Sequence, residues 1–151
     1  MTAQELWDVF EKLNPEINAD FDAWQFGVEA DTLAQLVIDG VKTATSSAYD
    51  LYEIDKEPIP KEGSYHIILN SRDEAVCLIK IIKVSFSPFN QVTQEHAFKE
   101  GEGDRTLDYW KQAHINFFTS LFEEYGLHFT TDKQVVLEEF EVIYPKKETL
   151  I

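Results

Sequence analysis

The hydrophobic positions near the start of the chain recur at the spacing of a helix. They are Leu6, Val9, Phe10 and Leu13. The preceding Thr2-Ala3-Gln4-Glu5 places a hydroxyl and a glutamate where they can cap a helix reciprocally, so we predict a helix over about 2–13. After a loop over 17–27, a second helix is predicted to begin at Asp31 and to end at Gly40.

The pattern changes to that of β-strands after residue 64. Residues 65–70 and 75–86 are rich in β-branched side chains, and the polar segment 71–74 between them is typical of a turn. Together they predict a β-hairpin. A third strand is predicted over 134–144, with a change of register near Glu138-Glu139.

Two further helices are predicted between these strands. The first covers about 93–99, and the second begins at Asp104 or Thr106 and ends at Gly126. The second carries an apolar stripe of Leu107, Trp110, His114, Phe117, Phe118, Leu121 and Phe122. Helices mixed with antiparallel strands predict one α+β domain over 1–151, built as a small curved sheet or barrel flanked by helices.

The chain carries 28 acidic and 13 basic residues, which gives a formal charge of −15. Proteins that hold a long phosphate backbone usually carry a basic stripe, so we do not expect a long DNA duplex as a partner. A local basic pocket or an uncharged nucleoside stays compatible with this charge. The sequence sets no oligomeric state.

The location of the protein is predicted from three features of the sequence. It has no apolar run long enough to cross a membrane, and its first residues lack the pattern of a signal peptide. The single Cys77 lies in an apolar run and is expected to be a buried, unreactive thiol. We therefore expect a cytoplasmic protein that does not bind a membrane.

Reactive side chains concentrate in two short segments. Residues 40–47 place an amine and several hydroxyls directly after a helix stop, and residues 100–104 place carboxylates on a glycine-rich turn. If Lys42, Thr45 and Glu100 meet in space, they can perform nucleophilic or acid–base chemistry without a metal. The alternative is that the first segment is ordinary loop and strand, and that the second is a surface turn that caps the next helix.

The order of these motifs resembles the ASCH domain family over about residues 24–144. The motifs are Gly40-x-Lys42-x-x-Thr45, the strand start Gly63-Ser64-Tyr65, and Glu100-Gly101-Glu102-Gly103-Asp104, with Trp110 and His114 downstream. The resemblance implies a PUA-like fold, which is a small β-barrel with peripheral helices. The first helix is then an addition, and the Glu-Gly-Glu-Gly-Asp turn indicates a larger bacterial branch of the family.

The resemblance also implies a function in RNA or nucleoside metabolism. Some small bacterial ASCH proteins are amidohydrolases that remove the acetyl group of N4-acetylcytidine with a Lys, a Thr and a Glu. Lys42 and Thr45 match their K-x-x-T, and Glu100 ends His96-Ala97-Phe98-Lys99-Glu100, which is similar to their H-A-x-x-E. The implied enzyme needs no metal and no cofactor. The alternative is a non-catalytic RNA-binding module or a sensor of a small ligand.

Two assignments of catalytic roles fit these residues. In the first, Thr45 attacks the acyl carbon, Lys42 takes its proton and Glu100 donates to the leaving cytosine N4. In the second, an ionised Lys42 stabilises the oxyanion and Glu100 activates a water. Because residues i and i+3 point to opposite faces of a strand, Lys42 and Thr45 can cooperate only if a turn or irregular loop separates them.

Further side chains near these segments are candidates for substrate binding. Aromatic rings can stack on a flat base, and polar groups can hydrogen-bond its edge. The candidates are Trp24, Ser46, Tyr49, Tyr52 and His114. The four histidines show no zinc-site spacing, so we predict no metal ligands.

Overall fold

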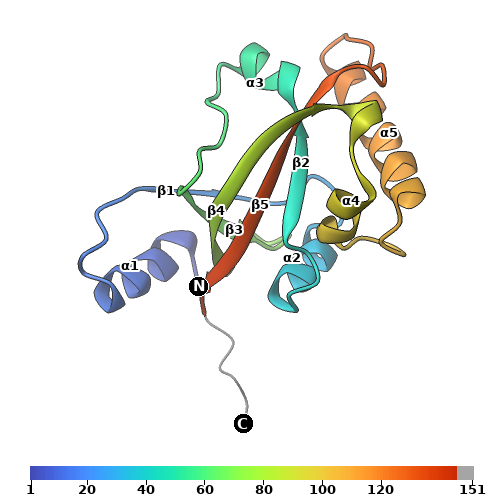
Figure 1. Ribbon diagram of the computed structural model, residues 1–151. Helices are drawn as coiled ribbons and strands as arrows, with labels where there is room; N and C mark the ends of the chain where they lie inside the picture. The colour runs from blue at the N-terminus through green and yellow to red at the C-terminus, as the bar shows by residue number, and fades with distance from the viewer. Residues whose placement is uncertain (146–151) are drawn as a thin grey trace.

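The protein folds into one curved, five-stranded sheet flanked by helices, as a computed structural model describes for residues 1–145 (Figure 1). The strands are β1 (Phe21–Trp24), β2 (Ala44–Ala48), β3 (Tyr65–Leu69), β4 (Ala75–Pro88) and β5 (Gln134–Tyr144). The helices are α1 (Ala3–Leu13), α2 (Ala30–Ile38), α3 (Tyr49–Asp55), α4 (Gln94–Glu100) and α5 (Leu107–Glu124), with a 3-10 turn at Phe89–Gln91. The predicted α+β class is confirmed.

The strand order is β1-β3-β4-β5-β2, and all pairs except the parallel β1–β3 pair are antiparallel. Strands β1 and β2 are the two edges and do not pair with each other. Among the described strands the sheet is therefore open. Of the two predicted forms, the curved and mainly antiparallel sheet is confirmed, and the strands do not close into a barrel. Figure 1 shows the two long central strands, β4 and β5, curving together through the middle of the molecule.

A β-bulge lies at the middle of the central β4–β5 pair. Ile81 faces Phe140 and Lys83 faces Glu139, so Ile82 of β4 has no partner and is half exposed. The register change predicted near Glu138-Glu139 is confirmed at this place, although the extra residue belongs to β4. The bulge matters for function because it lies next to the part of β5 that faces β2.

Helix α1 closes one end of the sheet. Its capping box is present: the Glu5 backbone N–H donates to Thr2 Oγ1 over 3.1 Å, and the Thr2 N–H donates to Glu5 Oε1 over 2.9 Å. Its buried face is Leu6, Trp7 and Phe10, which packs on Ile67 and Leu78. Figure 1 shows α4 and α5 at the other end of the molecule, near β2.

Helix α5 buries the stripe that its periodicity predicts. Its buried residues are Trp110, His114, Phe118 and Phe122. The Thr106 hydroxyl is the N-terminal cap, and it accepts a hydrogen bond from the Tyr109 N–H over 3.1 Å. A capping role for Asp104 at this helix was therefore wrong, since its carboxylate accepts from Thr106 instead.

Two other local predictions were also wrong. The segment predicted as a loop contains β1, which is held by parallel pairing to β3 rather than by a local turn. Helix α2 begins after Glu29, which has a left-handed backbone, and Asp31 does not cap it. The Asp31 carboxylate instead accepts hydrogen bonds from the N–H and the hydroxyl of Ser71, in the turn between β3 and β4.

Candidate functional site

Lys42 lies in an irregular loop between α2 and β2. The backbone turns at Gly40, whose φ is +76°, and the N–H groups of Val41 and Lys42 both donate to the Leu36 carbonyl over 3.0 Å. Strand β2 then begins at Ala44, so Thr45 is a strand residue. The irregular backbone that cooperation between Lys42 and Thr45 requires is present.

Glu100 is the last residue of α4, and it is buried against Lys42. Each of the two side chains is only 1% exposed. Lys42 Nζ lies 3.4 Å from Glu100 Oε1 and 2.9 Å from Glu102 Oε2. The sequence placed Glu100 on the glycine-rich turn, but the left-handed turn starts only at Gly101, so Glu100 is the buried end of α4 and lines the recess described below.

The Glu100 carboxylate faces a donor on every side. Its Oε2 accepts from His96 Nε2 and from Trp110 Nε1, both over 2.7 Å. Its Oε1 faces Lys42 and also His114 Nε2 at 3.5 Å. Burial alone would raise the pKa of Glu100, but the Lys42 ammonium and the hydrogen bonds from His114 and His96 outweigh burial and hold that pKa well below its usual range. Glu100 is therefore an ionised acceptor rather than a proton donor.

His114 links this cluster to α5. Its Nδ1 lies 2.8 Å from the Trp110 carbonyl, and its ring stacks on the Trp110 indole at a centroid distance of 4.3 Å. Both ring nitrogens therefore face acceptors, which favours the doubly protonated ring. Burial lowers the pKa of His114, but the hydrogen bond and charge of Glu100 outweigh burial and leave this pKa raised.

Glu100, Glu102 and His114 are close enough to form a cation site. One ligand atom from each lies within 4.8 Å of the others. The Lys42 ammonium already sits between the two carboxylates, and a metal ion would have to displace it. The arrangement supports an ammonium-centred site rather than a metal centre.

The turn after Glu100 depends on a glycine. Gly101 has φ +75°, and a Cβ there would lie 2.5 Å from the Val41 carbonyl oxygen. We expect Gly101→Ala to lower the free energy of unfolding in urea denaturation, because it adds both backbone strain and a clash beside Lys42. Gly126→Ala is the matched control, since Gly126 has φ +71° and no atom near the added Cβ. Gly101→Ala should cost at least about 1 kcal/mol more than the control, and equal costs would contradict the close packing of this turn on Val41.

Two neighbouring cavities share part of their lining, including Thr45. The smaller is a recess of about 70 Å³ that contains the Lys42 cluster, and the larger has a volume of about 670 Å³. The smaller recess is lined by Lys42, Glu100, Glu102 and His114, among others. Residues that line both are Phe26, Gly27, Thr45, Ser46 and Phe117. Lys42, Thr45 and Glu100 thus line one recess, which shares five of its lining residues with a larger cavity.

Four of the five candidate binding residues line these cavities. Trp24 and Tyr52 line the larger one, His114 lines the recess, and Ser46 lines both. The Ser46 hydroxyl is buried and has no hydrogen-bond partner within residues 1–145. Tyr49 is not among the lining residues and packs edge-on against Phe86 at a centroid distance of 5.9 Å.

The larger cavity also contains two titratable residues that sequence reasoning missed, His66 and Glu138. The Trp24 indole N–H donates to His66 Nδ1 over 2.9 Å, so His66 Nε2 carries the hydrogen that points to Ser64 Oγ. Burial lowers the pKa of His66, although the charge of Asp22 acts in the opposite direction. His66 is therefore a neutral ring that orients the Trp24 side chain.

Glu138 is 4% exposed and lies directly opposite Thr45 in the β2–β5 pair. Burial, and then the negative charge of Glu100, raises the pKa of Glu138 to about 7. The sequence offered one signal for this residue, which is a glutamate directly after Val135-Val136-Leu137 in a predicted strand. That signal predicted a change of register, and only the structure shows that Glu138 is buried opposite Thr45.

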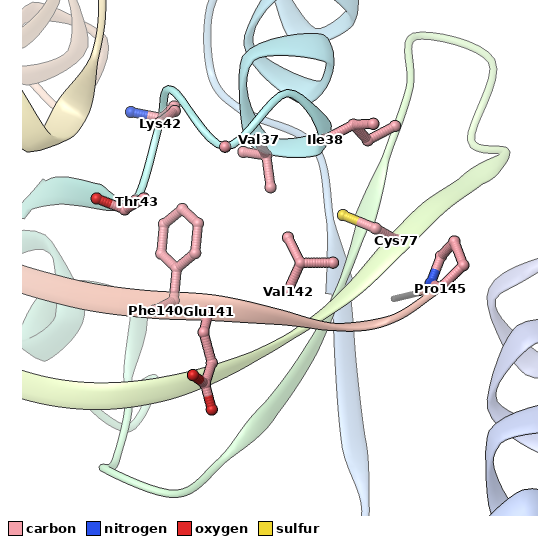
Figure 2. Close-up of a pocket in the computed structure, with 10 residues that line it drawn as sticks. Val37, Ile38, Lys42, Thr43, Cys77, Phe140, Glu141, Val142 and Pro145 are labelled. Carbon is pink, nitrogen blue, oxygen red and sulfur yellow. The ribbon is translucent and has the colours of Figure 1, made fainter. Parts of the chain in front are cut away.

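A third cavity, of about 360 Å³, lies on the other side of the Lys42 loop. Its wall is mostly apolar and includes Val37, Cys77, Phe140 and Val142. Figure 2 shows the Lys42 amino group pointing away from these side chains. Burial raises the pKa of Cys77 to about 12, so its thiol is not activated. Lys42 also belongs to the wall of this cavity, but its amino group is directed toward Glu100 and Glu102 instead.

The chain matches known proteins over nearly its whole length. The family model of the ASCH domain matches residues 22–144. An ASCH domain from Lactobacillus crispatus JV V101 is 34% identical, with a TM-score of 0.81 over 92% of this chain and 89% of that chain. A protein from Enterococcus faecalis V583 is 35% identical, with a TM-score of 0.86 over 93% of this chain and 86% of that chain. No curated protein matches the chain.

The chain belongs to the ASCH domain family. The family is PUA-like and is associated with RNA-related functions and with the binding of RNA or small ligands. The resemblance that the motifs indicated is confirmed. Within residues 1–145, no helix is both long and apolar enough to cross a membrane.

Proposed function

We propose that this protein is an amidohydrolase that removes an acyl group from the N4 amine of a cytidine-like nucleoside. One observation carries the proposal: Lys42, Thr45 and Glu100 line a recess that shares lining residues with a neighbouring cavity of about 670 Å³. That volume lies within the usual range of small-molecule sites, so a nucleoside fits it. The acyl group would enter the recess, and the base would occupy the larger cavity.

The contacts of Lys42 favour one assignment of its role. Its amino group lies between the carboxylates of Glu100 and Glu102, which stabilise an ammonium ion. A charged Lys42 cannot take the proton of Thr45, but it can stabilise the oxyanion that forms when the acyl carbon is attacked. Thr45 and Ser46 both carry hydroxyls and line both cavities, and Thr45, which matches the family motif, is the proposed nucleophile.

The contacts of Glu100 favour a positioning role. Its two oxygens face His96, Trp110, His114 and Lys42, so neither is free to activate a water. An ionised Glu100 also cannot donate a proton to the leaving amine. In the proposed enzyme Glu100 holds the Lys42 ammonium beside Thr45 and keeps it charged.

The shape and charge of the larger cavity support a nucleoside rather than a polynucleotide. Trp24 and Tyr52 supply aromatic surfaces for a base, and the Ser46 hydroxyl supplies an unused hydrogen-bonding group. The formal charge of −15 works against a long phosphate backbone. We place the reaction in the cytoplasm, where the single Cys77 thiol would stay reduced.

The test is release of cytidine from N4-acetylcytidine by the purified protein, followed by chromatography. We expect turnover by the wild type and a loss of at least about a thousandfold in Thr45→Val, because the nucleophile is removed. Thr43→Val is the matched control, since Thr43 is exposed two residues away, and it should keep the wild-type rate. No turnover of N4-acetylcytidine or of bulkier N4-acyl cytidines by the wild type would overturn the proposal.

A further inference from the structure

Glu138 is a buried acid for which the residues of the ASCH motif provide no role. It is 4% exposed and lines the larger cavity. Within residues 1–145, no side chain donates a hydrogen bond to its carboxyl group or forms an ion pair with it. A buried carboxyl group usually has such a partner, so this one is available to a ligand in the cavity.

Strand pairing places Glu138 beside the proposed nucleophile. Thr45 of β2 and Glu138 of β5 are direct partners in the antiparallel ladder. Directly opposite residues carry their side chains on the same face of a sheet, with Cβ atoms about 4.5–5.5 Å apart. A glutamate side chain spans that separation, so its carboxyl group is within reach of the Thr45 hydroxyl and of a substrate bound next to it.

We propose that Glu138 is the proton-transfer residue of this site, serving in turn the Thr45 hydroxyl, the leaving N4 amine and the hydrolytic water. This role rests on the proposed amide hydrolysis. Glu138 acts as the general base and then as the general acid. Lys42 and Glu100 cannot take these roles, because each holds the other in its ionised form.

The first half-reaction transfers the acyl group to Thr45. The Glu138 carboxylate takes the hydroxyl proton of Thr45 while Oγ1 forms a bond to the acyl carbon, and the Lys42 ammonium faces the resulting oxyanion. The bond between the acyl carbon and N4 then breaks. The Glu138 carboxylic acid returns its proton to N4, which leaves as the free amine of cytidine.

The second half-reaction hydrolyses the threonine ester. Glu138 takes a proton from water as the water oxygen bonds to the acyl carbon. The bond from this carbon to Oγ1 then breaks, and Glu138 returns the proton to Thr45. The balance is one acylated nucleoside and one water consumed, with one nucleoside and one carboxylic acid released.

The surroundings of Glu138 suit proton transfer near neutral pH. A residue that serves both as base and as acid is most effective when its pKa lies near the working pH, and the pKa of Glu138 is about 7. The titratable groups that face the same cavity are Asp22 of β1, Tyr52 of α3, Glu57 of the following loop and His66 of β3. None of these four is a cation, since His66 is neutral. In the neighbouring recess the cationic Lys42 and His114 are paired with Glu100 and Glu102, and the charge that acts on Glu138 is the negative charge of Glu100.

The experiment compares wild type, Glu138→Gln, Glu138→Asp and Glu141→Gln on N4-acetylcytidine across pH 5 to 9. Glutamine keeps the shape of the side chain but cannot transfer the proton, so we expect kcat to fall by at least about a hundredfold with little change in KM. The wild-type kcat should rise with an apparent pKa near 7, and Glu138→Gln should lose this inflection. Glu138→Asp should restore part of the rate. Glu141→Gln, an exposed carboxyl group on the same strand, should behave as wild type.

The outcomes separate the two proposals. Turnover by the wild type with Glu138→Gln within about threefold and with the same inflection would overturn the role of Glu138 and leave the amidohydrolase intact. No turnover by the wild type would overturn the amidohydrolase, and the role of Glu138 with it. The pH dependence of kcat is measured on the wild type itself. Absence of an inflection near pH 7 would therefore count against Glu138 even if Glu138→Gln failed to fold.

Discussion

Lys42→Met is expected to lower the free energy of unfolding by about 3–5 kcal/mol, which is the usual cost of removing one partner from a buried ion pair. The methionine keeps the volume of the side chain but leaves Glu100 with no full positive charge beside Oε1 except that of His114. Both Lys42 and Glu100 are 1% exposed, so bulk solvent does not compensate the charge that is left. Urea denaturation at pH 7 measures the change.

The matched control is Lys99→Met. Lys99 also pairs with two carboxylates, those of Glu95 and Glu139, but its side chain is 35% exposed. Such a surface pair is worth roughly 0–1 kcal/mol. If both variants cost the same, the Lys42 pair does not stabilise the fold. A double-mutant cycle of Lys42→Met with Glu100→Gln then measures the coupling between the two side chains directly.

Glu138→Gln is expected to make the protein more stable than wild type at pH 8, by about 3 kcal/mol. The carboxyl group has a pKa of about 7 in the folded protein against 4.5 when free, so the folded state binds its proton more tightly. The stability from this group is fully present below pH 4.5 and is lost as the pH rises through 7. Glutamine carries no charge and avoids that loss.

The prediction is checked by urea denaturation of both proteins between pH 4 and pH 8.5. The difference in stability should be small at pH 4 and should grow until about pH 7. Glu141→Gln, which removes an exposed carboxyl group from the same strand, should show no such growth. A constant difference across this range would mean that Glu138 is not a buried acid with a raised pKa.

The helices and strands with a regular hydrophobic pattern could be predicted from the sequence, whereas the edge strand β1 could not. The apolar stripe of α5 and the β-branched runs of β3 and β4 are local signals, and the buried residues of these elements belong to them. Strand β1 has four residues, and its pairing to β3 joins Phe21 to Tyr65, more than forty residues away. A pairing between such distant residues depends on the rest of the sheet, so no local sequence pattern predicts it.

The candidate site, too, could be predicted from the sequence only in part. The resemblance to a family brought Lys42, Thr45 and Glu100 together, and spacing alone would not have paired residues 58 positions apart. The depth of Glu100 could not be predicted, because an acidic, glycine-rich segment is usually a surface turn. Glu138 was missed because its environment is made by three strands, and a glutamate in a strand usually faces solvent.

The position of Trp24 at the edge of the sheet has a consequence for how a ligand reaches the site. Strand β1 is held by β3 on one side only, while the other four strands keep their own ladder without it. Local opening of these four residues would move one wall of the larger cavity without breaking the β2–β5 ladder that holds Thr45 and Glu138. In the proposed enzyme, entry of the ligand and chemistry on it would then lie at opposite edges of one sheet, and the rate of entry could change without disturbing the reacting groups.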